Sequence, residues 1–125
     1  MANWRFGKRS LDNLKGVHPD LQDIVKRALE LSPYDFGISE GVRTLERQIE
    51  LVKARKSRTM ASRHLTGHAI DFFVIVDGKV TWDFKYYTAV SVAFKQAAEE
   101  KGVKINWGGD WKTFKDGPHI ELART

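Results

Sequence analysis

The sequence contains no cysteine, only three prolines and two methionines, and no long apolar run. Without cysteine there is no disulfide and no thiolate ligand, so any metal has to be held by His, Asp or Glu, which suits zinc better than copper(I) or an iron–sulfur cluster. No apolar stretch approaches the roughly 18 residues that span a membrane, so we expect no stable membrane insertion. The first residues also lack the apolar centre of a secretion signal, from which we expect the protein to be made and kept in a cytoplasm.

The composition is typical of one globular domain, which we expect to span residues 1–125. Hydrophobic residues make up 42% and charged residues 30% of the chain, both ordinary values for a soluble protein. The net charge of +5 and the pI near 9.6 favour polyanionic partners, such as nucleic acid, anionic lipid or a cell-wall polymer. The positive charge is densest between Lys53 and Arg63, where a solvated helix end is the simpler explanation. No nucleic-acid-binding motif accompanies it.

Hydrophobic periodicity predicts alternating helices and strands without a linker or an internal repeat. Pro19 suits the first turn of a helix, and Thr44 is a plausible N-cap for a helix with Leu45, Ile49 and Val52 on one face. We expect helices at 18–32, from 44 onward and at 86–102, strands at 36–41, 70–76, 80–82, 103–107 and 119–122, and loops at 56–63 and 108–118. The pattern predicts an α+β fold, a small and mostly antiparallel sheet flanked by about three helices.

Two short segments carry the residues with the most informative spacing. In the first, His64 is followed seven positions later by Asp71; in the second, Asp116 precedes His119 by three positions. Two imidazoles and one carboxylate make a three-ligand zinc site with one coordination position open, and Asp116 is left as a candidate general base. Gly67 argues against one continuous helix here, so we expect a loop ligand and a strand ligand to converge with His119.

Spacing alone leaves an ordinary explanation open. The chain has four histidines, and a single histidine is more often a surface or core residue than a ligand. His68, four residues after His64, would join a metal site only if that stretch were helical, so we expect it outside the ligand set. No His-Glu-x-x-His motif is present, which excludes the common helix-borne protease site.

The motif pair resembles a known family. The string Ser62-x-His64-x-x-Gly67-x-Ala69-x-Asp71, followed by Asp116-x-x-His119, is similar to the signature of the zinc D-Ala-D-Ala carboxypeptidase and endolysin family. That family includes the vancomycin-resistance dipeptidases and the L-alanyl-D-glutamate endopeptidases of bacteriophages, and the short length resembles the single-domain phage endolysins most. The resemblance implies the fold shared by hedgehog domains and DD-peptidases. It extends to the segments Phe6-Gly7-Lys8-Arg9-Ser10, Val17-His18-Pro19-x-Leu21, Gly41-Val42-Arg43-Thr44 and Trp107-Gly108-Gly109-Asp110-Trp111.

The resemblance implies a role for each matching position in the zinc centre. His64, Asp71 and His119 match the zinc ligands of the family. Asp116 matches the acidic general base that takes a proton from water and passes it to the leaving amine. The family often has Glu at this position, and the shorter Asp116 side chain would lie farther from the water.

Other matches concern the substrate, and each has an ordinary structural alternative. Arg43 matches an arginine that holds the substrate or the developing oxyanion, a role suited to its fixed fork of donors, although a strand-end salt bridge is the alternative. Ser62 matches a substrate-contacting serine or simply caps a turn, and Gln48 is a substrate-binding candidate near Arg43. Asp110 either orients a ligand imidazole or caps its loop. Trp107 and Trp111 either wall the cleft or belong to the core.

These residues imply a zinc metallopeptidase that hydrolyses a bond in the peptidoglycan stem peptide, with cleavage between L-alanine and D-glutamate. We expect a monomeric phage-type endolysin that waits in the host cytoplasm and then acts on the cell wall from the periplasm. A D-Ala-D-Ala carboxypeptidase shares every motif and remains an alternative. Two interpretations without catalysis are a basic nucleic-acid-binding module and an inactive zinc signalling domain. Asp116 and Arg43 argue against the inactive zinc domain.

Overall fold

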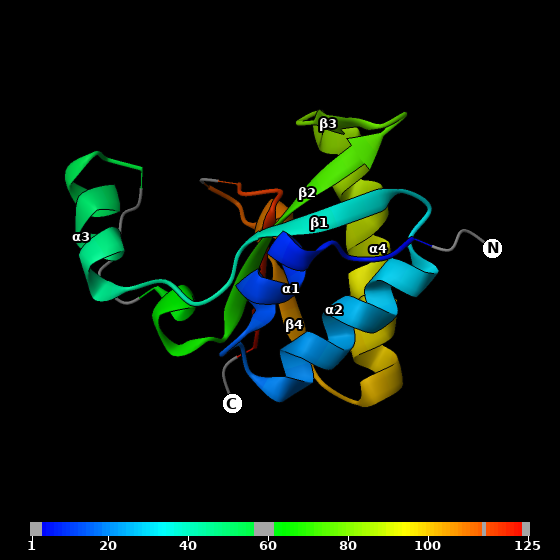
Figure 1. Ribbon diagram of the computed structural model, residues 1–125, viewed down its shortest axis with the longest axis horizontal. Helices are drawn as coiled ribbons and strands as arrows, with labels where there is room; N and C mark the ends of the chain where they lie inside the picture. The colour runs from blue at the N-terminus through cyan, green and yellow to red at the C-terminus, as the bar shows by residue number, and fades with distance from the viewer. Residues whose placement is uncertain (1–3, 57–61, 114, 124–125) are drawn as a thin grey trace.

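The computed structural model describes residues 4–56, 62–113 and 115–123. Within these ranges the chain forms four α-helices, two short 3-10 helices and one antiparallel sheet (Figure 1). None of these helices has the length and apolar character needed to cross a membrane. In chain order the elements are α1 (Lys8–Leu14), α2 (Pro19–Leu31), β1 (Asp35–Glu40), α3 (Leu45–Lys53), η1 (Arg63–Thr66), β2 (Ala69–Val76), β3 (Lys79–Thr81), α4 (Phe84–Lys101), β4 (Ile105–Trp107), η2 (Gly108–Asp110) and β5 (His119–Leu122).

The sheet places β2 at its centre. The strand order is β1-β2-β5-β4, with β3 also paired to β2, and every pairing is antiparallel. In this register Asp71 lies between Glu40 of β1 and His119 of β5. The β1–β2 register shifts between Ile38 and Glu40, and such irregularities often redirect side chains beside functional sites.

The alternation of side chains along β2 separates the core from the functional face. Ile70, Phe72 and Val74 are fully buried and belong to the core cluster that includes residues of α2 and α4. Since successive side chains of a strand point to opposite faces, Asp71 and Phe73 face the other way. Packing of α2 and α4 on one face therefore leaves the Asp71 face available for chemistry.

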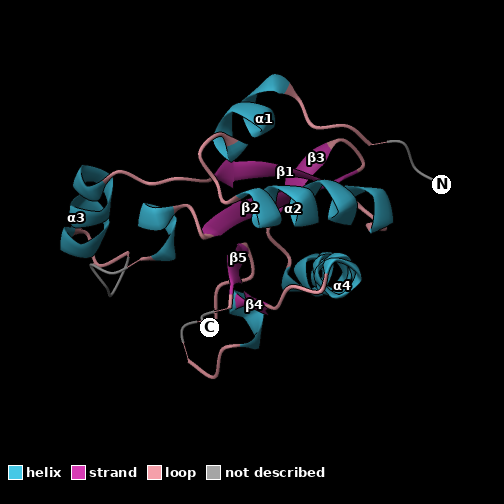
Figure 2. Cartoon of the chain, turned by 90° about the horizontal axis from the view of Figure 1, so that it is seen from below, coloured by secondary structure: helices cyan, strands magenta, loops and turns pink. Residues whose placement is uncertain are grey.

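Helix α1 protects the exposed edge of the sheet, and the sequence patterns did not predict it. The Ile38 N–H donates to Ser10 Oγ (3.0 Å), and Asn13 Nδ2 donates to the Ile38 carbonyl (2.7 Å). These bonds occupy the N–H and the carbonyl of Ile38 in an edge strand, where unpaired backbone groups could otherwise pair with another chain. Figure 2 shows α1 beyond β1, on the far side of that strand from α4. The structure thus adds a short fourth helix to the three expected.

The predicted elements form with small shifts at their ends. The helix expected at 18–32 is α2, and the N-cap predicted at Thr44 is present, with its side chain accepting from Arg47 N. The apolar face predicted for α3 is only partly buried: Leu45 is 57% exposed and Ile49 and Val52 are half-buried, whereas Gln48 is the fully buried residue of that helix. Accordingly, α3 stands apart from the other helices in Figures 1 and 2. The loop predicted at 56–63 lies mostly outside the described residues.

Candidate active site

Three side chains from different elements converge on one point. His64 comes from η1, Asp71 from β2 and His119 from β5, and each offers a ligand atom within 4.8 Å of the other two. Asp71 Oδ1 lies 3.2 Å from His64 Nε2 and 3.3 Å from His119 Nδ1. The predicted convergence of these three residues is therefore confirmed, and they are the only such group of His, Asp and Glu side chains among the described residues.

In each imidazole, the outer nitrogen, which is the one that does not contact Asp71, has its own hydrogen-bond acceptor. His64 Nδ1 lies 2.9 Å from the Gly41 carbonyl, and His119 Nε2 lies 2.8 Å from Glu121 Oε1. A carbonyl or carboxylate acceptor requires a proton on that nitrogen, so in the neutral ring the other nitrogen, which lies beside Asp71, keeps its lone pair for a metal ion. Glu121 was missed in the sequence, although a His-x-Glu pair on a predicted strand places both side chains on one face.

The chain can reach this geometry because Gly67 ends η1 in the left-handed region, with φ +76°. A Cβ at this position would lie 2.7 Å from the Gly16 carbonyl oxygen, so another residue would meet both backbone strain and a clash. The Gly67 carbonyl in turn accepts from His18 N (2.8 Å). The short 3-10 turn followed by glycine, rather than a helix, therefore joins His64 to the strand that bears Asp71.

Asp116 and His119 belong to one turn, which explains their spacing. The His119 N–H donates to the Asp116 carbonyl (3.1 Å), and the Asp116 N–H donates to the Gly108 carbonyl (3.0 Å). A Cβ on Gly108 would lie 2.3 Å from the Asp116 carbonyl oxygen, so glycine permits this close approach. Burial and the nearby Asp71 raise the pKa of Asp116, while His119, His64 and Arg43 oppose the rise. The charges of the three ligand candidates and of Arg43 therefore act on the carboxyl group of the candidate base.

Arg43 lies next to Asp71 and makes ion pairs or hydrogen bonds with several side chains. Its Nη2 lies 3.8 Å from Asp71 Oδ2, and its Nε pairs with Glu40 Oε1. Its Nη1 donates to Gln48 Oε1 (2.7 Å) and to Ser62 Oγ (3.5 Å). Only 9% of the Arg43 side chain is exposed, and Gln48 is fully buried. Ser62 also caps η1 by accepting from His64 N (3.2 Å).

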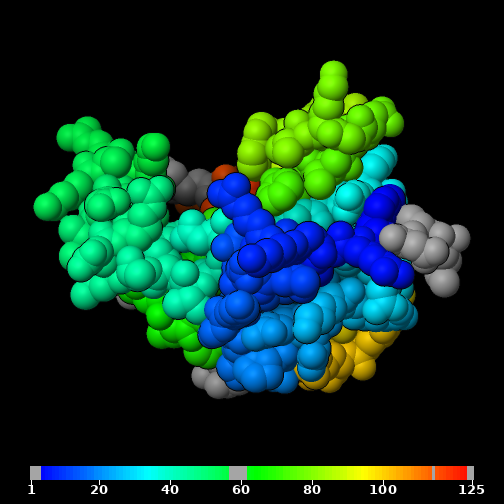
Figure 3. Space-filling model, in the orientation of Figure 1, coloured from blue at the N-terminus to red at the C-terminus, as the bar shows by residue number. Residues whose placement is uncertain are grey.

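The remaining candidates divide between the site and its surroundings. Asp110 is exposed and pairs with Lys95 Nζ (2.7 Å), so the structure gives its carboxylate a partner on α4 rather than a ligand imidazole. Trp107 is buried, with its indole N–H donating to the Gly117 carbonyl (2.7 Å). The Trp111 ring lies 5.1 Å from the His119 ring, centroid to centroid, and is the tryptophan beside the site. In Figure 3 the surface is hollowed between α3 and the β2–β3 turn, with atoms of the β4–β5 segment at the bottom.

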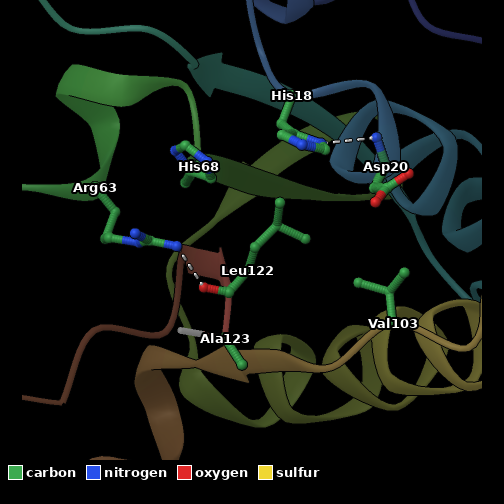
Figure 4. A pocket seen from close by; sticks show the side chains of 7 residues that line it. All are labelled: His18, Asp20, Arg63, His68, Val103, Leu122 and Ala123. Carbon is green, nitrogen blue, oxygen red and sulfur yellow. Dashed lines mark hydrogen bonds between the residues drawn. The ribbon is translucent and has the colours of Figure 1, made fainter. Parts of the chain in front are cut away.

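A separate pocket of about 400 Å³ lies near the beginning of α2 and the end of β5, and none of the three ligand candidates lines it. His68 is one of its lining residues, opposite His18, with 5.4 Å between the ring centroids (Figure 4). His68 Nδ1 contacts Thr66 Oγ1 at 2.6 Å. Burial, followed by the charges of Arg63 and His18, lowers the pKa of His68. The expectation that His68 stands outside the ligand set agrees with this position.

In the metal-free protein, Asp71 pairs with His64 and His119, and His119 also pairs with Glu121. Burial raises the pKa of Asp71, but hydrogen bonds from His119 and His64 outweigh it and hold that pKa well below its ordinary range. Burial lowers the pKa of His119, but hydrogen bonds to Asp71 and Glu121 prevail and raise it to about 9. His119 is therefore a cation between two carboxylates in the metal-free protein at neutral pH.

These shifts predict how the stability of the metal-free protein depends on pH. The pKa of His119 is about 9 when folded, against an ordinary 6.5, so its contribution is complete below about pH 6.5 and lost as the pH rises through about 9. Asp71 acts oppositely, because its contribution is present above its ordinary pKa and lost as the pH falls toward the folded value. We expect chelator-treated protein to lose on the order of 2–3 kcal/mol of unfolding free energy between pH 6 and 9.5. Denaturant titrations along a pH series measure this, and a flat profile across that range would contradict it.

Comparison with solved structures gives the class of protein that this fold and site define. The L-Ala D-Glu endopeptidase ChiX of Serratia marcescens is 47% identical, with a TM-score of 0.91 over 97% of this chain and 92% of ChiX. The vancomycin-resistance D,D-dipeptidase VanXYg, solved with a D-Ala-D-Ala phosphinate analogue, has a TM-score of 0.53 over 85% of this chain and 50% of its own. At 18% identity the second likeness concerns the fold alone. The architecture is that of a class of peptidases.

Sequence comparison then places the chain within that class. The family model described as phage L-alanyl-D-glutamate peptidase matches residues 2–123. The L-alanyl-D-glutamate peptidase of Escherichia phage T5 is 39% identical, in a match that covers 97% of this chain and 99% of that protein. The chain belongs to the phage L-alanyl-D-glutamate peptidase family, as the motif pair indicated.

Proposed function

We propose that this protein is a zinc-dependent endolysin that cleaves the L-alanyl–D-glutamate bond of the peptidoglycan stem peptide. The observation that carries the proposal is the convergence of His64, Asp71 and His119, with Asp116 held to the same turn as His119. The choice of the L-alanyl–D-glutamate bond rests on the similarity to ChiX and to the phage T5 peptidase, which are named for cleaving it. The positive charge of the chain suits a polymer whose stem peptides carry carboxylates.

The donor set fits zinc. Two imidazole nitrogens and one carboxylate oxygen, with a fourth position open, are the ligands of a catalytic zinc site. The outer nitrogens of both imidazoles have acceptors, as metal-bound histidines usually do. A zinc ion at this site would polarise the scissile carbonyl and lower the pKa of a bound water toward ~7.

The residues around the proposed ligands transfer the proton, stabilise charge and contact the substrate. Asp116 takes a proton from the attacking water and delivers it to the leaving amine, a role suited to a carboxyl group whose pKa is raised by burial and by the nearby Asp71. Arg43 offsets the negative charge of Asp71, and its positive charge stabilises the oxyanion that develops on the substrate. Ser62 fixes the turn that carries His64 and contacts the substrate. Gln48, being buried, acts on substrate through Arg43.

The cellular setting completes the proposal. Residues 1–125 act as one peptidase domain and as a monomer, with bacterial peptidoglycan as the partner. The enzyme collects in the host cytoplasm and reaches the wall when the inner membrane is opened. The alternative reaction, removal of D-alanine from the end of the stem peptide, is distinguished from the proposed one by its products.

Cell lysis under metal control tests the proposal. We expect the protein to clear a suspension of outer-membrane-permeabilised Gram-negative cells, to stop when treated with a chelator, and to recover when zinc is restored. Mass spectrometry of digested sacculi should show fragments with a new amino terminus at D-glutamate. Release of D-alanine instead would establish the carboxypeptidase reaction, and a folded, zinc-loaded protein that leaves sacculi intact would refute the endolysin function.

A further inference from the structure

Glu121 contacts a candidate metal ligand but has no place in the reaction described above. Its Oε1 lies 2.8 Å from His119 Nε2, and both side chains are largely buried, with 15% and 8% exposed. Glu121 and His119 are separated by Ile120, which is fully buried in the core. Because side chains alternate along a strand, the carboxylate and the imidazole share the face that carries Asp71.

We propose that Glu121 is a positioning residue that fixes the ring orientation and tautomer of His119 for zinc, an inference that rests on the proposed zinc function. A carboxylate at Nε2 accepts a hydrogen bond from the N–H of that nitrogen and, in the neutral ring, leaves the Nδ1 lone pair directed at the centre shared with Asp71. It also makes the ring a stronger electron donor, which is the usual effect of a carboxylate behind a metal-bound imidazole.

The two imidazoles differ in this respect. His64 Nδ1 contacts the neutral carbonyl of Gly41, whereas His119 Nε2 contacts a carboxylate. The residue opposite Glu121 on β2 is Ala69, which is fully buried. Directly opposed side chains in an antiparallel pair lie about 5 Å apart at Cβ, so a methyl group leaves room for the Glu121 carboxyl beside His119. This space requirement explains why a small residue, Ala69, stands between Gly67 and Asp71.

The test compares zinc affinity and tautomer in Glu121→Ala, Glu121→Gln and a matched control, Asp110→Asn. Asp110 is exposed and paired with Lys95, so its variant changes a carboxylate near the site without touching His119. Zinc dissociation constants are measured by competition with a chromophoric chelator, and NMR of the imidazole nitrogens shows which nitrogen of His119 carries the proton.

For Glu121→Ala we expect zinc binding about 10–100-fold weaker than wild type, the usual range for loss of such a partner. Glu121→Gln retains an oxygen that can accept from Nε2, so its loss should be smaller, and it serves as the isosteric variant if alanine impairs folding. In the zinc-loaded proteins, where a metal-bound imidazole is neutral, His119 should be protonated at Nε2 in the wild type and should mix tautomers in Glu121→Ala, while Asp110→Asn matches the wild type in both measurements.

Two outcomes overturn the inference at different levels. If wild type binds zinc and both Glu121 variants bind it equally well with an unchanged His119 tautomer, only the role of Glu121 is refuted. If the folded wild type does not bind zinc, the proposed metal function fails and the positioning role fails with it.

Discussion

Replacing Asp116 by Asn is expected to reduce peptidoglycan hydrolysis about 10²–10⁴-fold, the range for loss of a general acid–base group, while zinc affinity stays within twofold. The amide has nearly the shape of the carboxylate but does not accept a proton. Asp116 is not one of the three convergent ligands, and its backbone bonds to Gly108 and His119 do not involve the side chain. The change therefore removes the proton carrier and leaves the turn in place.

The measurement is kcat on a purified stem-peptide substrate, with zinc content determined on the same sample. Asp116→Glu provides a second variant, because it retains an acid with a longer reach, and should keep more activity than Asp116→Asn. Asp110→Asn again serves as the matched control, since its carboxylate lies in the same loop and pairs with Lys95. Asp116→Asn with full activity would remove Asp116 from the mechanism and direct attention to another base.

Periodicity predicted the elements whose apolar residues form continuous faces. The helix with Leu21, Ile24 and Val25 at helical spacing and the strand through Phe72 both formed where the pattern placed them, and both are buried. Helix α1 was not predicted because it has seven residues and no side-chain cap. It is held by long-range bonds from Ser10 and Asn13 to one strand residue, which local patterns do not encode.

The candidate site was predictable to the extent that its spacing reflects local geometry. The interval of three between Asp116 and His119 corresponds to one hydrogen-bonded turn, and the sharp turn at Gly67 joins His64 to the next strand. Supporting contacts were harder to assign. Asp110 was a candidate to orient a ligand, but Lys95 of α4 holds it, and Glu121 has that position instead. Only the fold shows which of two carboxylates meets an imidazole.

The second large effect is expected at Asp71. We expect Asp71→Asn to weaken zinc binding about 10²–10³-fold, which corresponds to roughly 3–4 kcal/mol. That is the share of one ligand when the roughly 10–16 kcal/mol of a zinc site is divided among its ligands. The amide preserves shape but removes the only anionic donor of the three. It also leaves Arg43 without the negative charge 3.8 Å from its Nη2, so hydrolysis should fall at least as far as zinc occupancy.

A second readout separates loss of a ligand from general damage to the fold. In the metal-free wild type, Asp71 helps to raise the pKa of His119, so Asp71→Asn should flatten the decline in stability between neutral and alkaline pH. Asp12→Asn is the control, because Asp12 forms an exposed pair with Lys15, and such pairs contribute little to stability. Zinc affinity equal to wild type in Asp71→Asn would remove this carboxylate from the ligand set. An unchanged pH profile would show that His119 does not depend on Asp71 for its charge.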